Sequence, residues 1–346
     1  MSALPSSVIL AYGLEPGPDG GAVPFGTGLI NDTFRAQRGV DTVIVQRVHP
    51  IFDASVHEDI EAVTAHLATK CVETPRLVRT REGGLFTVDH EGRVWRALTY
   101  LDGTSHDRFP TEAHAAEAGA LVGRFHAALL DFEHAYVFSR KGVHDIGFRE
   151  AGFREALATH GAHRLRSAVH DLGTRAEVLL RDAVPLGALP PRHSHGDLKA
   201  SNLLFRGSHG LALVDLDTMA SMMWIFEMGD ALRSWCNRSA EDDPSSSIDV
   251  VTYEAALSGY GTTGLHVTEA ERGLLARGVL TISLELALRF MTDALAESYF
   301  GFDQARYPAR GEHNLARARA QLSLAESVVA HLPRLDTIAS GVLRTS

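Results

Sequence analysis

The chain has 346 residues, of which 45% are hydrophobic and 22% are charged, an ordinary composition for a globular protein with a sizeable core. Its formal net charge of −10 argues against nucleic acid as the main partner, because such a partner requires a basic face. Two cysteines far apart in sequence (Cys71 and Cys236), no signal-peptide pattern and no apolar run of ~20 residues predict a cytoplasmic protein without a membrane span.

The first hundred residues carry mostly strand patterns. β-Branched or aromatic runs bounded by turn residues predict strands at Thr42–Val48, Gly84–Val88 and Arg93–Tyr100. Between them, Ser55–Thr69 has apolar residues every three or four positions, which predicts a helix.

Two features of this part could bind a nucleotide. Phe25–Phe34 reads as a glycine-containing turn between strands, whose backbone N–H groups could cover phosphates. Arg47 lies where a kinase strand carries the phosphate-contacting Lys of the V-A-I-K motif, and Glu58 or Glu61 could orient it. The alternative for Arg47 is a solvated residue at a strand edge. The nucleotide-binding candidates are Gly26, Gly28, Asn31, Thr33 and Arg47.

After residue 103 the patterns become helical. Apolar faces predict helices over Thr111–Phe132, from a capping box at Thr268 through Phe290, and over Leu315–Leu332, whereas Ser239–Ser247 reads as an exposed loop. The exception is a predicted pair of short strands, Asn202–Phe205 and Leu211–Asp217. We therefore predict an α+β, protein-kinase-like fold of two lobes. Residues 1–101 would form a small antiparallel-sheet lobe that binds the nucleotide, and residues 102–346 a larger, mostly helical lobe that carries catalysis and the substrate.

The chemistry is predicted to centre on the run from His195 to Asn202, His-Gly-Asp-Leu-Lys-Ala-Ser-Asn. It matches the kinase catalytic loop H-R-D-x-x-x-x-N, with Gly196 in place of Arg. Asp197 could accept the proton of an attacking hydroxyl, and Lys199 could reach the γ-phosphate. Asn202 and Asp215 supply the oxygen ligands that magnesium prefers. Asp217 could either contact the substrate or brace the loop.

These segments resemble the aminoglycoside phosphotransferase and choline kinase superfamily, and within it the N-acetylhexosamine 1-kinases. The C-terminal runs Gly229–Arg233, Arg289–Asp293 and His313–Leu322 carry the finer resemblance, because a generic kinase does not need them. The resemblance implies ATP and Mg²⁺ as cofactors, and transfer of the γ-phosphate to the anomeric C1 hydroxyl of GlcNAc or GalNAc. It also implies Asp197 as the base and Asn202 and Asp215 as metal ligands. The further residues that it implies are Leu98, Tyr100 and Leu101 in an adenine-binding hinge, and Asp217, Arg233, Arg289 and Asp293 at the sugar.

Other readings stay open at this point. The acceptor could be an aminoglycoside, another hexose or a choline-like amino alcohol, although an aromatic content of 7% argues mildly against the aromatic cage that choline needs. A nucleotide-binding regulator without transferase activity is a further alternative. Salt bridges between helices are the alternative for Arg233, Arg289 and Asp293. Leu29 and Glu227 also depart from the family's usual residues, which puts the identity of the sugar in doubt.

Overall fold

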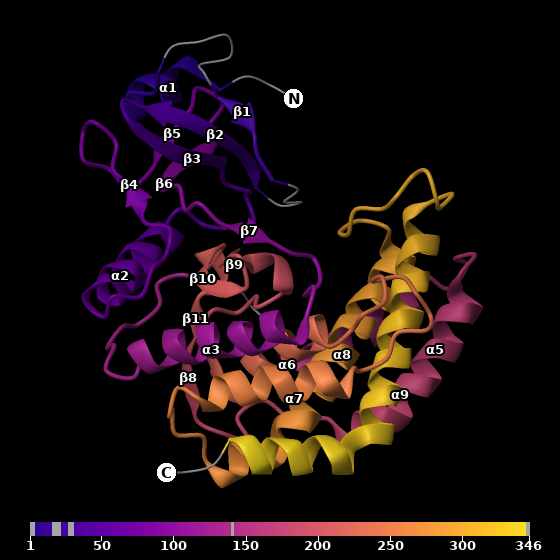
Figure 1. Ribbon diagram of the computed structural model, residues 1–346. Helices are drawn as coiled ribbons and strands as arrows, with labels where there is room; N and C mark the ends of the chain where they lie inside the picture. The colour runs from indigo at the N-terminus through magenta and orange to yellow at the C-terminus, as the bar shows by residue number, and fades with distance from the viewer. Residues whose placement is uncertain (1–3, 16–21, 27–30, 140–141, 344–346) are drawn as a thin grey trace.

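A computed structural model describes residues 4–15, 22–26, 31–139 and 142–343 (Figure 1). A small sheet lies at one end of the molecule and a larger group of helices at the other, with the strands β7 to β11 between them. This arrangement agrees with the predicted α+β class. In the described part of the chain, no helix combines the length and the apolar character needed to cross a membrane.

The small sheet is antiparallel throughout, with the strand order β1-β2-β3-β6-β4 and β5 paired to β6. Helix α1 (Ser6–Tyr12) packs on it, so that Val8 and Tyr12 are buried with Val45 and Trp95 in a separate small core. The predicted strand at Gly84–Val88 is shorter than expected, because Gly84 lies in a turn closed by the Thr80 hydroxyl. The strands are β1 (Val23–Pro24), β2 (Asp32–Arg38), β3 (Asp41–Arg47), β4 (Leu77–Val78), β5 (Thr87–Val88) and β6 (Val94–Thr99).

Helix α2 (Val56–Thr69) is the helix predicted over Ser55–Thr69. Its apolar residues Ile60, Val63 and Leu67 are buried in the main core, together with the helices of the C-terminal part. The helix also contacts the short turn at residues 216–218. Helix α2 therefore links the strand-rich part to the segment that follows Asp215.

Seven helices account for most of the remaining described residues. The helix predicted over Thr111–Phe132 ends earlier, at Ala128, and the capping box at Thr268 is confirmed by the bonds between its side chain and Glu271. Helices α4 to α7 were not anticipated by the sequence patterns above. The helices are α3 (Glu112–Ala128), α4 (Ile146–Thr159), α5 (Arg166–Leu179), α6 (Trp224–Trp235), α7 (Val250–Gly261), α8 (Glu269–Ala296) and α9 (Arg310–Val342).

Helices α3 and α7 cross at two glycines. A Cβ added to Gly119 would lie 1.8 Å from the Ala256 carbonyl oxygen, and one added to Gly259 would lie 1.8 Å from the Ala116 carbonyl oxygen. Real side chains never approach this closely, so each backbone is in direct contact with the other. Helix α3 also contacts β10, and it lies under the hairpin β9–β10 in Figure 1.

Short antiparallel strands flank the predicted catalytic segment on both sides. Strand β8 leads into it and pairs with β11, and the hairpin β9–β10 follows it. The predicted strand Leu211–Asp217 is wrong in extent, because β10 ends at Leu213 and residues 216–218 form a 3₁₀ turn. The strands are β7 (Thr104–Ser105), β8 (Pro191–Ser194), β9 (Leu203–Arg206), β10 (His209–Leu213) and β11 (Ala220–Met223).

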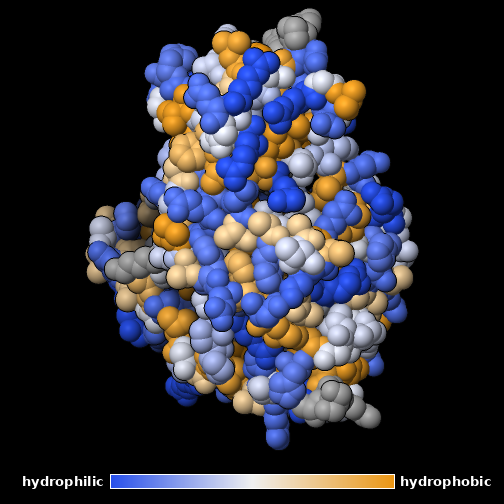
Figure 2. Space-filling view, turned by 90° about the vertical axis from the view of Figure 1, so that its left-hand side faces the viewer, coloured by the Kyte–Doolittle hydropathy of each residue, from blue (hydrophilic) through white to orange (hydrophobic). Residues whose placement is uncertain are grey.

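The large exposed apolar side chains come from separate elements, as Leu10, Val40, Leu130 and Val178 illustrate. On the face drawn in Figure 2, hydrophobic residues form small groups among hydrophilic ones. Scattered apolar residues of this kind are normal for a globular surface.

Candidate active site

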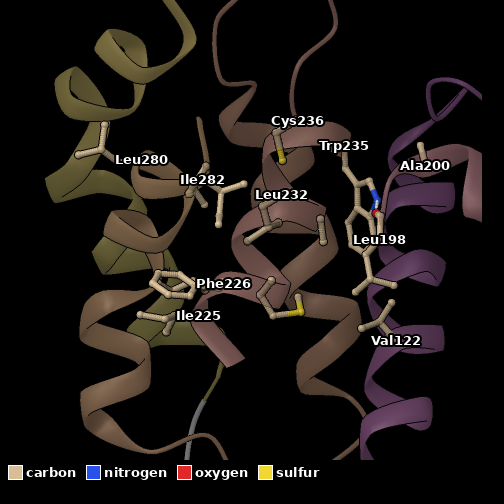
Figure 3. Packing of buried hydrophobic residues seen from close by; sticks show 14 of the residues in the cluster. Val122, Leu198, Ala200, Ile225, Phe226, Leu232, Trp235, Cys236, Leu280 and Ile282 are labelled. Atoms are coloured by element: carbon tan, nitrogen blue, oxygen red, sulfur yellow. Dashed lines mark hydrogen bonds between the residues drawn. The ribbon is translucent and has the colours of Figure 1, made fainter. Parts of the chain in front are cut away.

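The loop from His195 to Asn202 alternates between residues that enter the core and residues that leave it. Leu198 and Ala200 are buried beside α6 (Figure 3), and the Trp235 indole donates to the Leu198 carbonyl over 2.7 Å. Asp197 and Lys199 point the other way, with 28% and 40% of their side chains exposed. Anchoring the apolar residues therefore leaves the two charged ones on the partly exposed side of the loop.

Gly196 is required by its backbone. Its φ of 82° is a conformation that favours glycine, and a Cβ at this position would lie 2.3 Å from the Thr218 carbonyl oxygen. The neighbouring His195 is fully buried, and its Nε2 lies 2.9 Å from the Val214 carbonyl oxygen. Burial lowers the pKa of His195. Its neutral ring thus holds together the loop and the chain that leads to Asp215.

Glu227 of α6 holds the start of the loop from the core side, a role that the sequence analysis did not assign. Its carboxylate accepts the backbone N–H groups of His195 and Gly196, over 2.7 and 2.9 Å, and also contacts the ring of His126. Burial acts to raise the pKa of Glu227, but His126 and these bonds lower it overall. In the sequence, Glu227 stood out only as a departure from the family's usual residue at this position.

Three predicted residues meet at the Asp197 carboxylate. The Lys199 ammonium lies 2.5 Å from Oδ2, and the Asn202 amide nitrogen donates to the same oxygen over 3.0 Å and to the Asp197 carbonyl over 2.8 Å. No described group donates to Oδ1, which leaves this oxygen able to accept a proton from a bound hydroxyl. Burial acts to lower the pKa of Lys199, but the charges of Asp197 and Asp215 raise it overall, which keeps the amine cationic.

Asp215 lies beside this group, in a turn and not on a strand as predicted. The Val214 amide donates to the Asn202 carbonyl over 2.9 Å, which brings the two predicted metal ligands together. Asp215 has φ 67° and ψ 59°, the left-handed region that non-glycine residues seldom adopt. Its burial, and the nearby charges of Asp217 and Asp197, raise its pKa to about 6.

Asp217 is fully buried. Both of its oxygens are occupied by the guanidinium of Arg96 from β6, and Asn31 donates to Oδ2 over 2.9 Å. Burial acts to raise the pKa of Asp217, but Arg96 lowers it. Of the two roles left open for Asp217, the contacts are those of a brace.

Arg47 has surroundings that differ from those of the lysine in the kinase pattern, and only part of the glycine turn lies within the described residues. Gly28 lies outside the described residues, Gly26 has φ 76° in the turn, and Thr33 lies on β2. Arg47 forms an ion pair with Asp32 and is one-third exposed. Glu61 instead pairs with Arg79 over 2.5 Å, and among the described residues no ion pair joins Glu58 to Arg47. The buried cation of this region is Arg96.

The residues proposed for the adenine hinge lie where β6 ends. Leu98 is still on the strand, in register with Ile44, and Tyr100 and Leu101 follow it into the connection to β7. The ring of Tyr100 packs edge-on against the ring of Phe25, with 6.0 Å between the ring centroids, so the hinge and the start of the glycine turn are neighbours.

The residues proposed for the sugar fall into two groups. Arg233 pairs with Asp230 over 2.8 Å and lies close to Asp197, whose charge acts on it. Asp293 instead accepts backbone N–H groups of residues 298–300, and Arg289 lies over the Phe300 ring. The first group borders the catalytic loop, and the second shapes the connection between α8 and α9.

The two groups are connected through Glu241. Its charge acts on Arg233, and it pairs with Arg317 over 2.8 Å, which in turn donates to the Gly301 carbonyl over 2.7 Å. The connection between α8 and α9 is therefore bound to Glu241 through Arg317, and the charge of Glu241 acts on Arg233.

The arrangement of loop, acidic turn and glycine turn is matched by a known family. The model of the phosphotransferase enzyme family (APH) matches residues 21–248, well over half of the chain. The chain belongs to this family. Its members are phosphotransferases, which agrees with the enzyme class predicted from the His195–Asn202 motif.

Curated relatives carry a different acceptor in their names from the predicted sugar. The homoserine kinase of Nitrobacter winogradskyi is 28% identical over 235 residues, 67% of this chain and 65% of that protein. The homoserine kinase of Acidiphilium cryptum is 29% identical over 225 residues, 62% of this chain and 66% of that protein. The matched part thus spans just under two thirds of each relative.

Solved structures of low identity confirm the fold class. An amicoumacin kinase in complex with AMP-PNP and Ca²⁺ is similar with a TM-score of 0.64 at 14% identity, over 92% of this chain and 91% of its own. A microcompartment-associated aminopropanol kinase also gives 0.64, at 18% identity and 94% coverage of both chains. An aminoglycoside phosphotransferase from Alicyclobacillus acidocaldarius gives 0.63, at 16% identity, over 99% of this chain and 98% of its own.

Proposed function

We propose that the protein is an ATP- and Mg²⁺-dependent kinase that transfers the γ-phosphate to a hydroxyl group of a polar small molecule. The observation that carries the proposal is the meeting of Lys199 and Asn202 at one oxygen of Asp197, with Asp215 next to them. A regulator without catalysis would have no need to keep the other oxygen of Asp197 open.

The donor set fits a magnesium ion. The Asn202 amide nitrogen is bound to Asp197, which directs the amide oxygen away from it, and the Asp215 carboxylate lies among other negative charges that a cation would offset. No cluster of three or more His, Cys, Asp or Glu side chains in the described residues could hold a metal. Asn202 and Asp215 would therefore share the ion with phosphates and waters, as magnesium sites commonly do. A magnesium ion held by these two residues would supply positive charge against the phosphate groups of the nucleotide.

The chain's own residues would contribute positioning and charge. Asp197 would accept the proton of the acceptor hydroxyl at Oδ1, while Lys199 and Asn202 hold its other oxygen. Lys199 stays cationic and lies where it could stabilise charge on the transferred phosphoryl group. The hinge at residues 98–101 and the glycine turn would bind the nucleotide, with the boundary between the two lobes near residue 101.

For the acceptor we propose an N-acetylhexosamine, phosphorylated at the C1 hydroxyl. Support comes from the segments that resemble the sugar 1-kinases, because Arg289–Asp293 of α8 and residues 313–322 of α9 flank the α8–α9 connection. Asp293 and Arg317 from these segments bind its backbone. A second candidate is an amino alcohol or hydroxy amino acid. It is favoured by the homoserine kinase relatives, and the neighbouring charges of Asp230 and Arg233 could bind an ammonium and a carboxylate.

The test is ADP release by the full chain with ATP and Mg²⁺ against a panel of GlcNAc, GalNAc, glucose, homoserine, aminopropanol, choline and an aminoglycoside. Phosphorus NMR of the product distinguishes an anomeric phosphate from a phosphate on another hydroxyl. An anomeric product from GlcNAc or GalNAc supports the sugar proposal. Turnover of homoserine or aminopropanol alone would replace the sugar with the second class, and no turnover with tight ATP binding would favour the regulator.

A further inference from the structure

The register of the small sheet decides which cation faces the candidate metal site. Gln46 of β3 is paired with Thr33 of β2 and with Arg96 of β6, so these three residues share one face of the sheet. Arg47, one residue further along, shares the opposite face with Asp32 and Trp95. On the face toward Asp217, β3 therefore carries the uncharged Gln46. The cation on this face is Arg96 of the neighbouring strand β6.

Arg96 is held by hydrogen bonds on both sides. Its Nε donates to the Gln46 amide oxygen over 2.9 Å, and the Gln46 amide nitrogen donates to the Thr33 hydroxyl over 3.2 Å. Its two terminal nitrogens bind the two oxygens of Asp217, and only 1% of the Arg96 side chain and none of the Asp217 side chain is exposed. A planar guanidinium in this two-point geometry fixes the orientation of the carboxylate as well as its position.

Asn31, at the end of the glycine turn, also binds the Asp217 carboxylate. Its amide nitrogen donates to Asp217 over 2.9 Å, and its amide oxygen accepts the His49 backbone N–H over 2.9 Å. From α2, the His57 ring acts electrostatically on both Arg96 and Asp217, whereas Asp59 is paired with His134 and Glu61 with Arg79. Arg96 therefore takes its acidic partner from the segment that follows Asp215, and not from the neighbouring helix.

Asp215 is constrained on both sides as a result. Before it, the Val214 amide is bound to the Asn202 carbonyl, and two residues after it the Asp217 carboxylate is fixed by Arg96 and Asn31. A non-glycine residue stays in the left-handed region only where its surroundings hold it there. The charge of Arg96 also acts directly on Asp215.

We propose that Arg96 is a positioning residue that couples the small sheet to the candidate metal ligand: by clamping Asp217 it holds Asp215 in its left-handed conformation, and Gln46 and Thr33 hold Arg96. The inference rests on the proposed function only in treating Asp215 as a ligand of the nucleotide-bound metal. The clamp itself is a statement about the conformation of residues 214–218.

The test compares Arg96→Met, Asp217→Leu and the double variant with the wild-type chain. Removing one member of a buried ion pair destabilises a protein strongly, whereas replacing both with apolar residues is often neutral. The double variant should therefore recover most of the thermal stability. It tests the clamp even if a single variant fails to fold. Arg38→Met on β2 is the control for the loss of an arginine from the same sheet. The readouts are amide hydrogen exchange at residues 214–218 without ligand, and the Mg²⁺ dependence of binding of a non-hydrolysable ATP analogue.

We expect the double variant to exchange faster at residues 214–218 and to need about 10- to 100-fold more Mg²⁺ for analogue binding, the range found when the residues that orient metal ligands are removed. Wild-type exchange and wild-type Mg²⁺ dependence in the stable double variant would overturn the inference, because the pair would then serve stability alone. If the wild-type chain binds no nucleotide, the proposed function fails. The exchange measurement still decides the clamp in that case, with faster exchange supporting it and unchanged exchange overturning it.

Discussion

His57 should make the stability of this protein fall steeply in mild acid. The side chain is fully buried on α2, and its Nδ1 lies 2.8 Å from the Ala54 carbonyl oxygen, which assigns the proton to Nδ1. Its Nε2 has no hydrogen-bond partner among the described residues. Protonation would create a buried N–H without an acceptor, close to the charge of Arg96. Burial first, and Arg96 second, lower the pKa of His57 from 6.5 to about 4.

The size and sign of the effect follow from that shift. Between about pH 6.5 and pH 4 the unfolded chain binds a proton at His57 and the folded chain does not, so the free energy of unfolding falls as the pH falls through this window. A difference of about 2.5 pKa units corresponds to about 3 kcal/mol, at about 1.4 kcal/mol per unit. Above pH 6.5 the contribution is fully present.

Urea unfolding of wild type and His57→Asn between pH 7 and pH 4 measures the contribution of His57 to the free energy of unfolding. Asn keeps a donor for the Ala54 carbonyl but does not titrate, so its own baseline stability does not matter and only the slope with pH is compared. His90→Asn, at a side chain that is 76% exposed, is the matched control and should retain the wild-type slope. The reasoning is refuted if wild type and His57→Asn lose the same free energy of unfolding over this range.

Three further predictions concern catalysis and packing. Asp197→Asn should lower kcat by about 10²- to 10⁴-fold in the ADP-release assay, as expected for loss of a general base, without changing the urea midpoint; unchanged turnover would exclude Asp197 as the base. Glu227→Gln should cost about 1–3 kcal/mol in unfolding free energy, because its NH₂ group cannot accept one of the two backbone N–H groups that the carboxylate now binds; a stability equal to wild type would show that the loop does not depend on this carboxylate. Gly119→Ala should destabilise by about 1–3 kcal/mol, since its Cβ would lie 1.8 Å from the Ala256 oxygen. Gly152→Ala, in an open position of α4, should stabilise by up to about 1 kcal/mol, and the reverse order in thermal unfolding would contradict the packing at the α3–α7 crossing.

The sequence alone determined the features that depend on local pattern. Residues close together in the sequence were enough to predict the capping box at Thr268, the helical face of α2 and the strands β3 and β6, and all four are present in the fold. The run from His195 to Asn202 also pointed to the family, because eight adjacent residues contain an aspartate, a lysine and an asparagine in the order of the kinase catalytic loop. Short strands such as β7 and β11, and helices α4 to α7, carry weaker patterns and depend on packing against the rest of the chain.

Tertiary structure decided which side chains share a face and which are buried. Arg47 matched the strand motif by position, but the pairing of β3 with β6 puts it on the opposite face from Arg96. Asp217 could not be assigned from sequence because its partners, Arg96 and Asn31, lie 121 and 186 residues away. Glu227 gave one weak signal, since a carboxylate that binds backbone N–H groups leaves no periodic pattern. Local spacing thus predicted the candidate residues of the site, whereas the buried ion pair between Arg96 and Asp217, beside its acidic turn, is brought together only in the folded chain.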